Sequence, residues 1–213
     1  MMITSADLQK MERVERLNLV NSLSGIKPAQ LIGTRSASGS DNLAIFNSIV
    51  HIGSNPPLLG FILRPDAQYR RDTFRNIHET GYFTLNHIHR PFLEKAHYTS
   101  AKFREAESEF AACGLTPEWI QDFPAPFVQQ SQVKLGMEYK QQIPIELNGT
   151  SLVIGEVAII VLPDRIIEDQ GHLNLALVDD LGISGLNTYY AIEKIARMPY
   201  ARPHEIPPME ELQ

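Results

Sequence analysis

Apolar residues near the N-terminus recur at every third position of the chain, which is the spacing of an amphipathic helix. This spacing predicts one helix over residues 5–24 that ends near Gly25 and Pro28. We expect the apolar face of this helix to cover another part of the protein. The recurring residues are Leu8, Met11, Val14, Leu17, Val20 and Leu23.

From residue 29 onward the pattern changes to an alternation of apolar and polar residues, which is typical of β-strands. The stretch AQLIGTRSASGSDNLAIFNSIVHI, residues 29–52, predicts two strands joined by a turn at Gly39. A third strand follows the pair Pro56-Pro57. Near the other end, residues 132–147 and 150–162 alternate on either side of Asn148-Gly149, and this dipeptide is a strong hairpin signal.

A helical pattern interrupts these strands twice. In RRDTFRNIHETG we expect a helix with Asp72 as the N-cap and Gly81 as the residue after its C-terminus, followed by a strand over residues 82–88. Residues 91–126 have an irregular helical pattern, which predicts an insertion between strands.

The sequence therefore predicts six or seven strands joined mostly by hairpins, a mainly β protein built as an antiparallel barrel with added helices. We expect a single domain over residues 1–213, with a C-terminal extension over residues 186–213. Glycine-rich nucleotide-binding motifs of the GxGxxG or GxxxxGK[ST] type are absent from the sequence. A bound nucleotide would therefore be held in another way.

Composition narrows the class of protein. A chain of 213 residues with 43% hydrophobic and 21% charged residues is typical of one globular domain. The net charge of −6 argues against a nucleic acid partner. Cys113 is the single cysteine and cannot form an intramolecular disulfide. With no signal-peptide pattern and no long apolar run, we expect a cytoplasmic protein without a membrane partner.

The expected helix start at residues 70–73 combines two arginines, Arg70 and Arg71, with the hydroxyl of Thr73. The first turn of a helix leaves backbone N–H groups unpaired, so this combination suits a phosphate group. A capped surface helix with solvated arginines explains the same residues.

His87 and His89 lie two positions apart on the expected strand, so both side chains point to the same face. Two histidines on one face suit a metal ion, but the sequence offers no third ligand. We therefore favour solvated histidines or histidines beside a cofactor.

Two other polar clusters do not predict catalysis. Glu105, Glu107 and Glu109 have the spacing of a solvated helix face, which we prefer to a pair of catalytic carboxylates. The serines around the turn at Gly39 lack the sequence context of a nucleophile, so hydrolase chemistry has no support.

The order and spacing of several motifs resemble the flavin reductase-like family of FMN-binding split-barrel proteins, which are antiparallel barrels of Greek-key type. The resemblance covers roughly residues 25–190. It rests on Asn42-Leu43-Ala44-Ile45-Phe46, Pro56-Pro57-Leu58, Arg71 to Asn86, Ser108-Glu109-Phe110, Gly114-Leu115-Thr116 and Gly155-Glu156-Val157.

This resemblance implies a cofactor site for FMN. The flavin ring would lie along the residues after the Asn42–Phe46 strand, and its phosphate would lie at the start of the helix. A further contact would come from the segment after residue 96. The residues so implied are Phe46, Asn47, Ser48, Ile49, Arg71, Asp72, Thr73, Asn86, His97 and Ser100. Family members commonly have serine in place of Asn47 and lysine in place of Arg71.

The resemblance implies an FMN-binding oxidoreductase that takes hydride from NADH or NADPH and passes electrons to a flavin or small-molecule acceptor. An FMN-binding electron carrier with little NAD(P)H turnover is the alternative, and a barrel that has lost its cofactor is a third. It also implies a homodimer. Residues that would be buried across its twofold axis, or would instead cap their own barrel, are Tyr189, Tyr190, Ile192 and Ile195.

Overall fold

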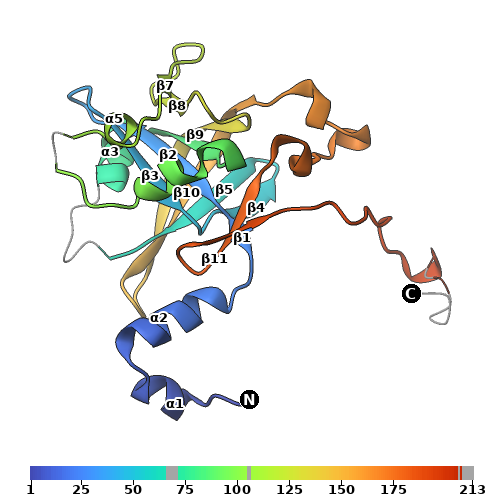
Figure 1. The fold of residues 1–213 in the computed structure, drawn as a ribbon. Coiled ribbons are helices and arrows are strands. Elements are labelled where there is room, and N and C mark those ends of the chain that lie inside the picture. The colour runs from blue at the N-terminus through green and yellow to red at the C-terminus, as the bar shows by residue number, and fades with distance from the viewer. Residues whose placement is uncertain (66–71, 105–106, 206, 208–213) are drawn as a thin grey trace.

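The alternating segments form one sheet of seven antiparallel strands, in the order β3-β2-β6-β9-β10-β5-β4 (Figure 1). The structure is a computed structural model that describes residues 1–65, 72–104, 107–205 and 207. The strands of this sheet are β2 (Gln30–Arg35), β3 (Asp41–Phe46), β4 (Val50–Ser54), β5 (Pro57–Leu63), β6 (Tyr82–His87), β9 (Lys134–Ile145) and β10 (Thr150–Val161).

Two smaller sheets and several helices are attached to the seven-stranded sheet. One small sheet has the order β1-β11-β12 and the other is the pair β7-β8. Their strands are β1 (Lys27–Pro28), β7 (Pro117–Glu118), β8 (Phe127–Val128), β11 (Leu181–Ser184) and β12 (Thr188–Ala191). The helices are α1 (Ser5–Lys10), α2 (Arg13–Ser22), α3 (Asp72–Thr80), α4 (Leu93–Tyr98) and α5 (Glu109–Ala112), with 3-10 turns η1 (Arg90–Phe92), η2 (Asp164–Ile166), η3 (Asp169–Gly171), η4 (Leu175–Val178) and η5 (Pro203–Glu205).

The seven-stranded sheet buries apolar residues on both of its faces. Leu31 of β2 belongs to a cluster that also contains Phe92 and Phe110 from the insertion. Its neighbour Ile32 points the other way, into a cluster around Phe61 and Phe83. Full burial of side chains of this size contributes about 1.5–3 kcal/mol each. The prediction of a mainly β antiparallel barrel is confirmed.

The backbone packs closely where β2 crosses the insertion. A Cβ atom built on Gly33 would lie 2.3 Å from the carbonyl oxygen of Pro126 and 2.6 Å from Oγ1 of Thr84. A glycine is therefore required at this position, because any side chain would separate the two layers.

The turns agree with the sequence pattern. Gly81 ends α3 with a φ of 80°, and its N–H donates to the carbonyl of Ile77. Gly149 has a φ of 71° in the hairpin between β9 and β10. Asp72 was predicted to be the N-cap of α3, and the structure makes it the first residue of the helix.

The second strand of the first hairpin is broken, although the sequence predicts one strand up to residue 52. β3 ends at Phe46 and pairs with β2, whereas β4 begins at Val50 and pairs with β5. The three residues between them, 47–49, have no strand structure. The chain thus changes its pairing partner at the segment where the cofactor residues are predicted.

The N-terminal region contains two helices, so the prediction of one helix over residues 5–24 is wrong. The carboxylate of Glu12 accepts hydrogen bonds from the N–H groups of Val14 and Glu15, which caps α2 and separates it from α1. Neither helix has a buried residue, and both project from the barrel (Figure 1). The apolar face of this region does not cover its own barrel.

The C-terminal extension is partly ordered against the barrel. β11 pairs with β1 and β12 pairs with β11. After residue 191 the described chain runs away from the barrel, and Ile195, Met198 and Tyr200 are exposed (Figure 1). Among the described residues, no helix is both long and apolar enough to cross a lipid bilayer.

Candidate functional site

The break between β3 and β4 is held in place by the hydroxyl group of Ser48. Its Oγ accepts a hydrogen bond from the N–H of Ile62 over 3.1 Å and donates to the carbonyl of the same residue over 3.3 Å. A side chain therefore replaces the backbone pairing that a continuous strand would have made with β5.

Two apolar residues flank this break and form a partly buried surface at the edge of the barrel core. Phe46 packs edge-on against Phe61, with ring centroids 5.0 Å apart. Ile49 contacts the same apolar cluster. Both side chains are half-buried, so each keeps part of its surface available to a ligand.

Asn47 points from this break toward the C-terminal extension. Its Nδ2 donates a hydrogen bond to the carbonyl of Gly185 over 2.6 Å. Gly185 lies in the turn between β11 and β12, so the tip of this hairpin lies beside the break.

The predicted phosphate end is organised by a network of side chains. Nδ2 of Asn42 lies 3.2 Å from Oγ1 of Thr73 and 3.3 Å from Oγ1 of Thr34, and it donates to both oxygens. Nδ2 of Asn76 donates to Thr34 as well, over 3.1 Å. Oγ1 of Thr73 thus accepts from Asn42, and its hydroxyl hydrogen has no partner among the described residues.

Of the other residues predicted at the phosphate end, the structure describes only Asp72. Asp72 forms an ion pair with Arg75 at 3.0 Å. Arg70 and Arg71 lie outside the described residues.

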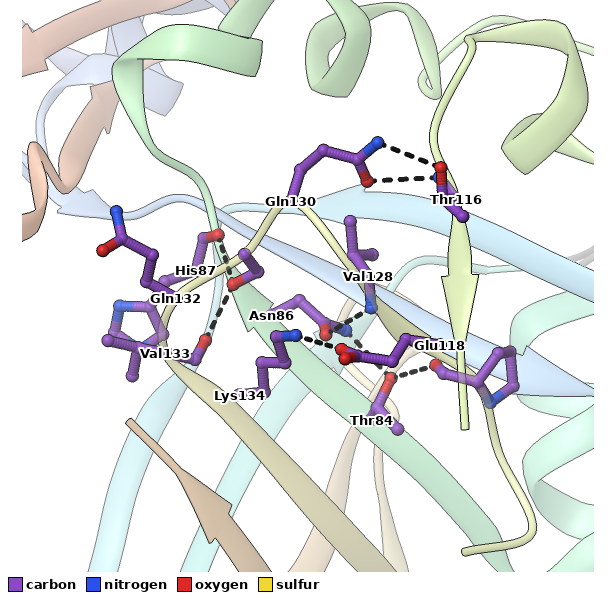
Figure 2. Close-up of polar contacts among 12 residues, drawn as sticks. Thr84, Asn86, His87, Thr116, Glu118, Val128, Gln130, Gln132, Val133 and Lys134 are labelled. Carbon is purple, nitrogen blue, oxygen red and sulfur yellow. Dashed lines mark hydrogen bonds and ion pairs between the residues drawn. The ribbon is translucent and has the colours of Figure 1, made fainter. Parts of the chain in front are cut away.

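The side-chain amide of Asn86 is fully committed to hydrogen bonds within the protein (Figure 2). Its Nδ2 donates to the carbonyl of Leu31 and to the hydroxyl of Thr84, and its Oδ1 accepts from the N–H of Val128. Asn86 is completely buried, with 0% of its surface exposed. Its contacts give it the role of joining β6 to β2 and β8.

His97 lies in the last turn of α4 and Ser100 follows the end of this helix. Nδ1 of His97 is 2.9 Å from the hydroxyl of Tyr189 in β12. Burial raises the pKa of Tyr189 to about 12, so this hydroxyl stays protonated at neutral pH and can donate to the imidazole. Ser100 is exposed, and its N–H donates to the carbonyl of His97.

His87 and His89 do share a face, and both are directed at Asp180. Nδ1 of His87 is 2.9 Å from Oδ2 of Asp180, and Nδ1 of His89 is 3.8 Å from Oδ1. His89 is buried, so the alternative of a solvated histidine is wrong at this position, and a histidine beside a cofactor stays a prediction. Within the described part of the chain, no group of three or more ligating side chains suits a metal ion.

Glu109 is likewise not part of a solvated helix face. Its Oε2 accepts a hydrogen bond from the N–H of Leu43 in β3 over 3.0 Å. Burial raises the pKa of this carboxyl group, opposed by the same hydrogen bond. Glu107 is exposed as predicted, and Glu105 lies outside the described residues.

A surface hollow of about 600 Å³ lies elsewhere, and its lining contains none of the predicted cofactor residues. It is bordered by Glu168, Asp169, Lys194 and Arg197. Nζ of Lys194 donates to both carboxylate oxygens of Glu168, which lowers the pKa of that glutamate. Lys194 and Arg197, which line this hollow, already pair with Glu168. The break at residues 46–49 is therefore the better candidate for a cofactor site.

Sequence analysis missed five residues that organise this region. Thr34 and Asn42 are directly opposite in the register of β2 and β3, so correct alignment of that hairpin would have placed them together. Asp180, Gly185 and Tyr189 come from residues 180–191, far along the chain, and no local sequence signal connects them with residues 47, 87 and 97.

The residues around the break suit a flavin. A flavin ring needs an apolar surface together with hydrogen-bonding groups along one edge, and the half-buried Phe46 and Ile49 flank the polar Asn47 and Ser48. The hydroxyl hydrogen of Thr73 and the first turn of α3 are donors of the kind that a phosphate requires.

Comparisons with known proteins support this reading of the fold. A curated relative from Aquifex aeolicus is 26% identical over 165 residues, which span 77% of this chain and 83% of the relative. A protein of Shewanella frigidimarina has a crystal structure described as that of a flavin reductase with a split barrel domain. It matches with a TM-score of 0.91 and 43% sequence identity, over 94% of this chain and 100% of that chain. Flavoredoxin of Desulfovibrio vulgaris has a TM-score of 0.71 and 25% identity, covering 83% of this chain and 92% of its own.

The model of the flavin reductase like domain matches residues 26–176, which are well over half of the chain. The match begins just before β1 and extends through the barrel and the insertion. The chain therefore belongs to the flavin reductase-like family of split-barrel proteins.

Proposed function

We propose that this chain is an NAD(P)H-dependent flavin reductase that binds FMN at the break between β3 and β4. The observation that supports the proposal most strongly is the pair of half-buried apolar residues Phe46 and Ile49 flanking the polar Asn47 and Ser48, in a member of this family. FMN would supply the redox chemistry by accepting hydride from NADH or NADPH and releasing electrons to a flavin or small-molecule acceptor.

In this proposal the role of the protein is to bind FMN and to orient it. Phe46 and Ile49 provide the apolar wall, and Ser48 fixes the backbone of the break against β5. Thr73 donates its hydroxyl hydrogen to the phosphate, with Asn42 holding the oxygen in place. We assign no acid or base catalyst, because the protein would accelerate the reaction by holding the hydride donor, NADH or NADPH, in contact with the hydride acceptor, FMN.

An absorbance scan of the purified protein, followed by titration with FMN, tests the binding site. We expect flavin bands or saturable quenching of FMN fluorescence, and Thr73→Val should raise the Kd for FMN about tenfold by removing one charge-assisted hydrogen bond. Ser38→Ala, an exposed serine in the turn between β2 and β3, is the matched control and should bind as the wild type does. A wild-type protein that neither carries nor gains FMN would disprove the proposal.

An electron carrier with little NAD(P)H turnover is the second candidate, favoured by the similarity to a flavoredoxin. The two candidates share the binding site and differ in turnover. Steady oxidation of NADH or NADPH in the presence of FMN favours the reductase. Binding of FMN without such oxidation, while chemically reduced FMN on the protein still donates to an acceptor, favours the carrier.

We also propose that the protein is a cytoplasmic homodimer. Its support is the apolar surface on the N-terminal helices and the C-terminal extension, which exposes Leu23 (71%), Ile195 (95%) and Tyr200 (85%). Surfaces of this kind are typical of subunit interfaces. Light scattering should give twice the chain mass of 24.0 kDa, and a mass of 24.0 kDa would contradict the proposal.

A further inference from the structure

The hairpin formed by β11 and β12, residues 181–191 (hereafter the C-terminal hairpin), makes only a short backbone connection to the rest of the protein. Its ladder with β1 has two residue pairs, Lys27 with Ile183 and Pro28 with Gly182. Apolar packing adds to this, since Leu181 and Ile183 are buried in the cluster that contains Leu31. The ladder with β1 does not involve the β3–β4 break or α4, whereas the apolar cluster includes Ala96 of α4.

Side-chain hydrogen bonds connect the C-terminal hairpin to three separate elements. Asp180, directly before β11, bonds to His87 at the end of β6. The turn carbonyl of Gly185 accepts from Asn47 in the β3–β4 break. These two bonds fix the start and the tip of the hairpin.

The third bond fixes the second strand, where the hydroxyl of Tyr189 lies 2.9 Å from Nδ1 of His97 on α4. Their rings also pack edge-on, with centroids 5.7 Å apart. Asn47 and His97 are both residues that sequence analysis predicts to hold FMN. The hairpin is thus hydrogen-bonded to two of the residues predicted to hold FMN.

The end of α2 lies beside this turn. Gly185 has a φ of 62°, and a Cβ atom built on it would lie 3.0 Å from Oγ of Ser22, the last residue of α2.

We propose that the C-terminal hairpin is a wall of the flavin site, and that Asn47 and Tyr189 are positioning residues that hold it closed. This inference rests on the proposed function. It gives Asn47 a role different from a direct flavin contact, because one hydrogen of its amide is committed to Gly185. It gives Tyr189 a role that acts through His97.

The test compares Tyr189→Phe with Tyr190→Phe. The first variant keeps the ring that packs on His97 and removes only the hydroxyl, whereas Tyr190 is 41% exposed and none of the described hydrogen bonds uses its hydroxyl. Asn47→Asp is a second, independent variant, because a carboxylate of the same size cannot donate to the carbonyl of Gly185.

Two measurements are made on each protein. Hydrogen exchange of the protein without flavin should be about fivefold faster over residues 181–191 in Tyr189→Phe and Asn47→Asp than in the wild type. Titration with FMN should give a Kd raised about fivefold, and the visible absorbance band of FMN at saturation should shift because the ring environment changes. Tyr190→Phe should match the wild type in all three readouts.

The outcomes separate this inference from the proposed function. If the wild type binds FMN and both variants equal Tyr190→Phe, the wall is disproved while the FMN site stands. If exchange accelerates but the Kd and the absorbance band are unchanged, the bonds hold the hairpin but the hairpin is not a wall, which also disproves it. A wild type that binds no FMN defeats both proposals.

Discussion

Nε2 of His89 accepts a hydrogen bond from the backbone N–H of Gln132 over 2.9 Å. This bond requires an unprotonated Nε2, so the neutral ring carries its hydrogen on Nδ1, the atom nearest to Asp180. His89 is 1% exposed. A buried neutral histidine with this bond resists protonation.

We expect this resistance to make the protein less stable in mild acid. Burial lowers the pKa of His89 from 6.5 to about 4; Asp180 and Asp179 oppose this shift, whereas His87 and Lys134 add to it. Between these two values the unfolded chain binds a proton that the folded chain does not. The free energy of unfolding should therefore fall as the pH is lowered from 6.5 to 4, by roughly 3 kcal/mol from this group.

Urea unfolding at pH 7, 5.5 and 4.5 measures this effect, with the pH values chosen across that window. His89→Gln, whose side-chain oxygen can still accept from Gln132, should lose most of the dependence. The exposed His51→Gln should keep it. A His89→Gln variant with the acid sensitivity of the wild type would assign the effect to other groups.

Glu109 should tolerate loss of its charge but not loss of its oxygen atoms. Its raised pKa means that the folded chain holds a proton to higher pH than the unfolded chain, so ionisation of this group reduces stability as the pH rises above 4.5. At pH 7 we expect Glu109→Gln to be as stable as the wild type or more so, since the amide oxygen still accepts from Leu43. Glu109→Ala should lose about 1–3 kcal/mol in urea unfolding, and equal losses in both variants would contradict this account.

Asn86→Asp is expected to affect stability rather than flavin binding. The carboxylate cannot donate to the carbonyl of Leu31 or the hydroxyl of Thr84, and it is buried. We expect a loss of at least about 2 kcal/mol in thermal unfolding, with an unchanged Kd for FMN at a temperature where the variant is folded. Asn18→Asp on the exposed surface of α2 is the control. An Asn86→Asp variant that is stable but binds FMN more weakly would instead show that Asn86 takes part in the cofactor site.

Gly33→Ala should disrupt the packing of β2 against the insertion. The added methyl group would meet the carbonyl of Pro126 at 2.3 Å, and backbone atoms cannot yield as a flexible side chain does. We expect a loss of about 3 kcal/mol or failure to accumulate as soluble protein. Gly53→Ala, where the nearest atom is 3.6 Å away, should be close to wild type. Similar stability of the two variants by thermal unfolding would show that the layers separate easily.

The strands and turns of the barrel were predictable because their signals are local. Alternation identified β2, β9 and β10, and Gly149 marked the turn between the last two. The break after Phe46 was not predictable, since it depends on the contact of Ser48 with Ile62 in another strand. The separation of α1 from α2 depends on a cap by Glu12, a residue outside the usual capping types.

The candidate site was predictable only in part, for the same reason. The motif residues are close to one another in sequence, whereas their partners Gly185 and Tyr189 come from the far end of the chain. The spacing of His87 and His89 correctly placed them on one face but carried no information about Asp180. The chemistry of single residues was visible in the sequence, and their long-range partners were not.

The pairing of β1 with β11 determines when this part of the protein can fold during synthesis. Lys27 and Pro28 leave the ribosome early, but their partners Ile183 and Gly182 are among the last residues of the barrel to be synthesised. Until then the N–H and C=O groups of this first strand bond to water, and the apolar cluster that holds Leu181 and Ile183 stays open. A nascent chain that is stalled or cut before residue 181 cannot form this sheet. Complete folding of β1 therefore requires that translation continue past residue 183.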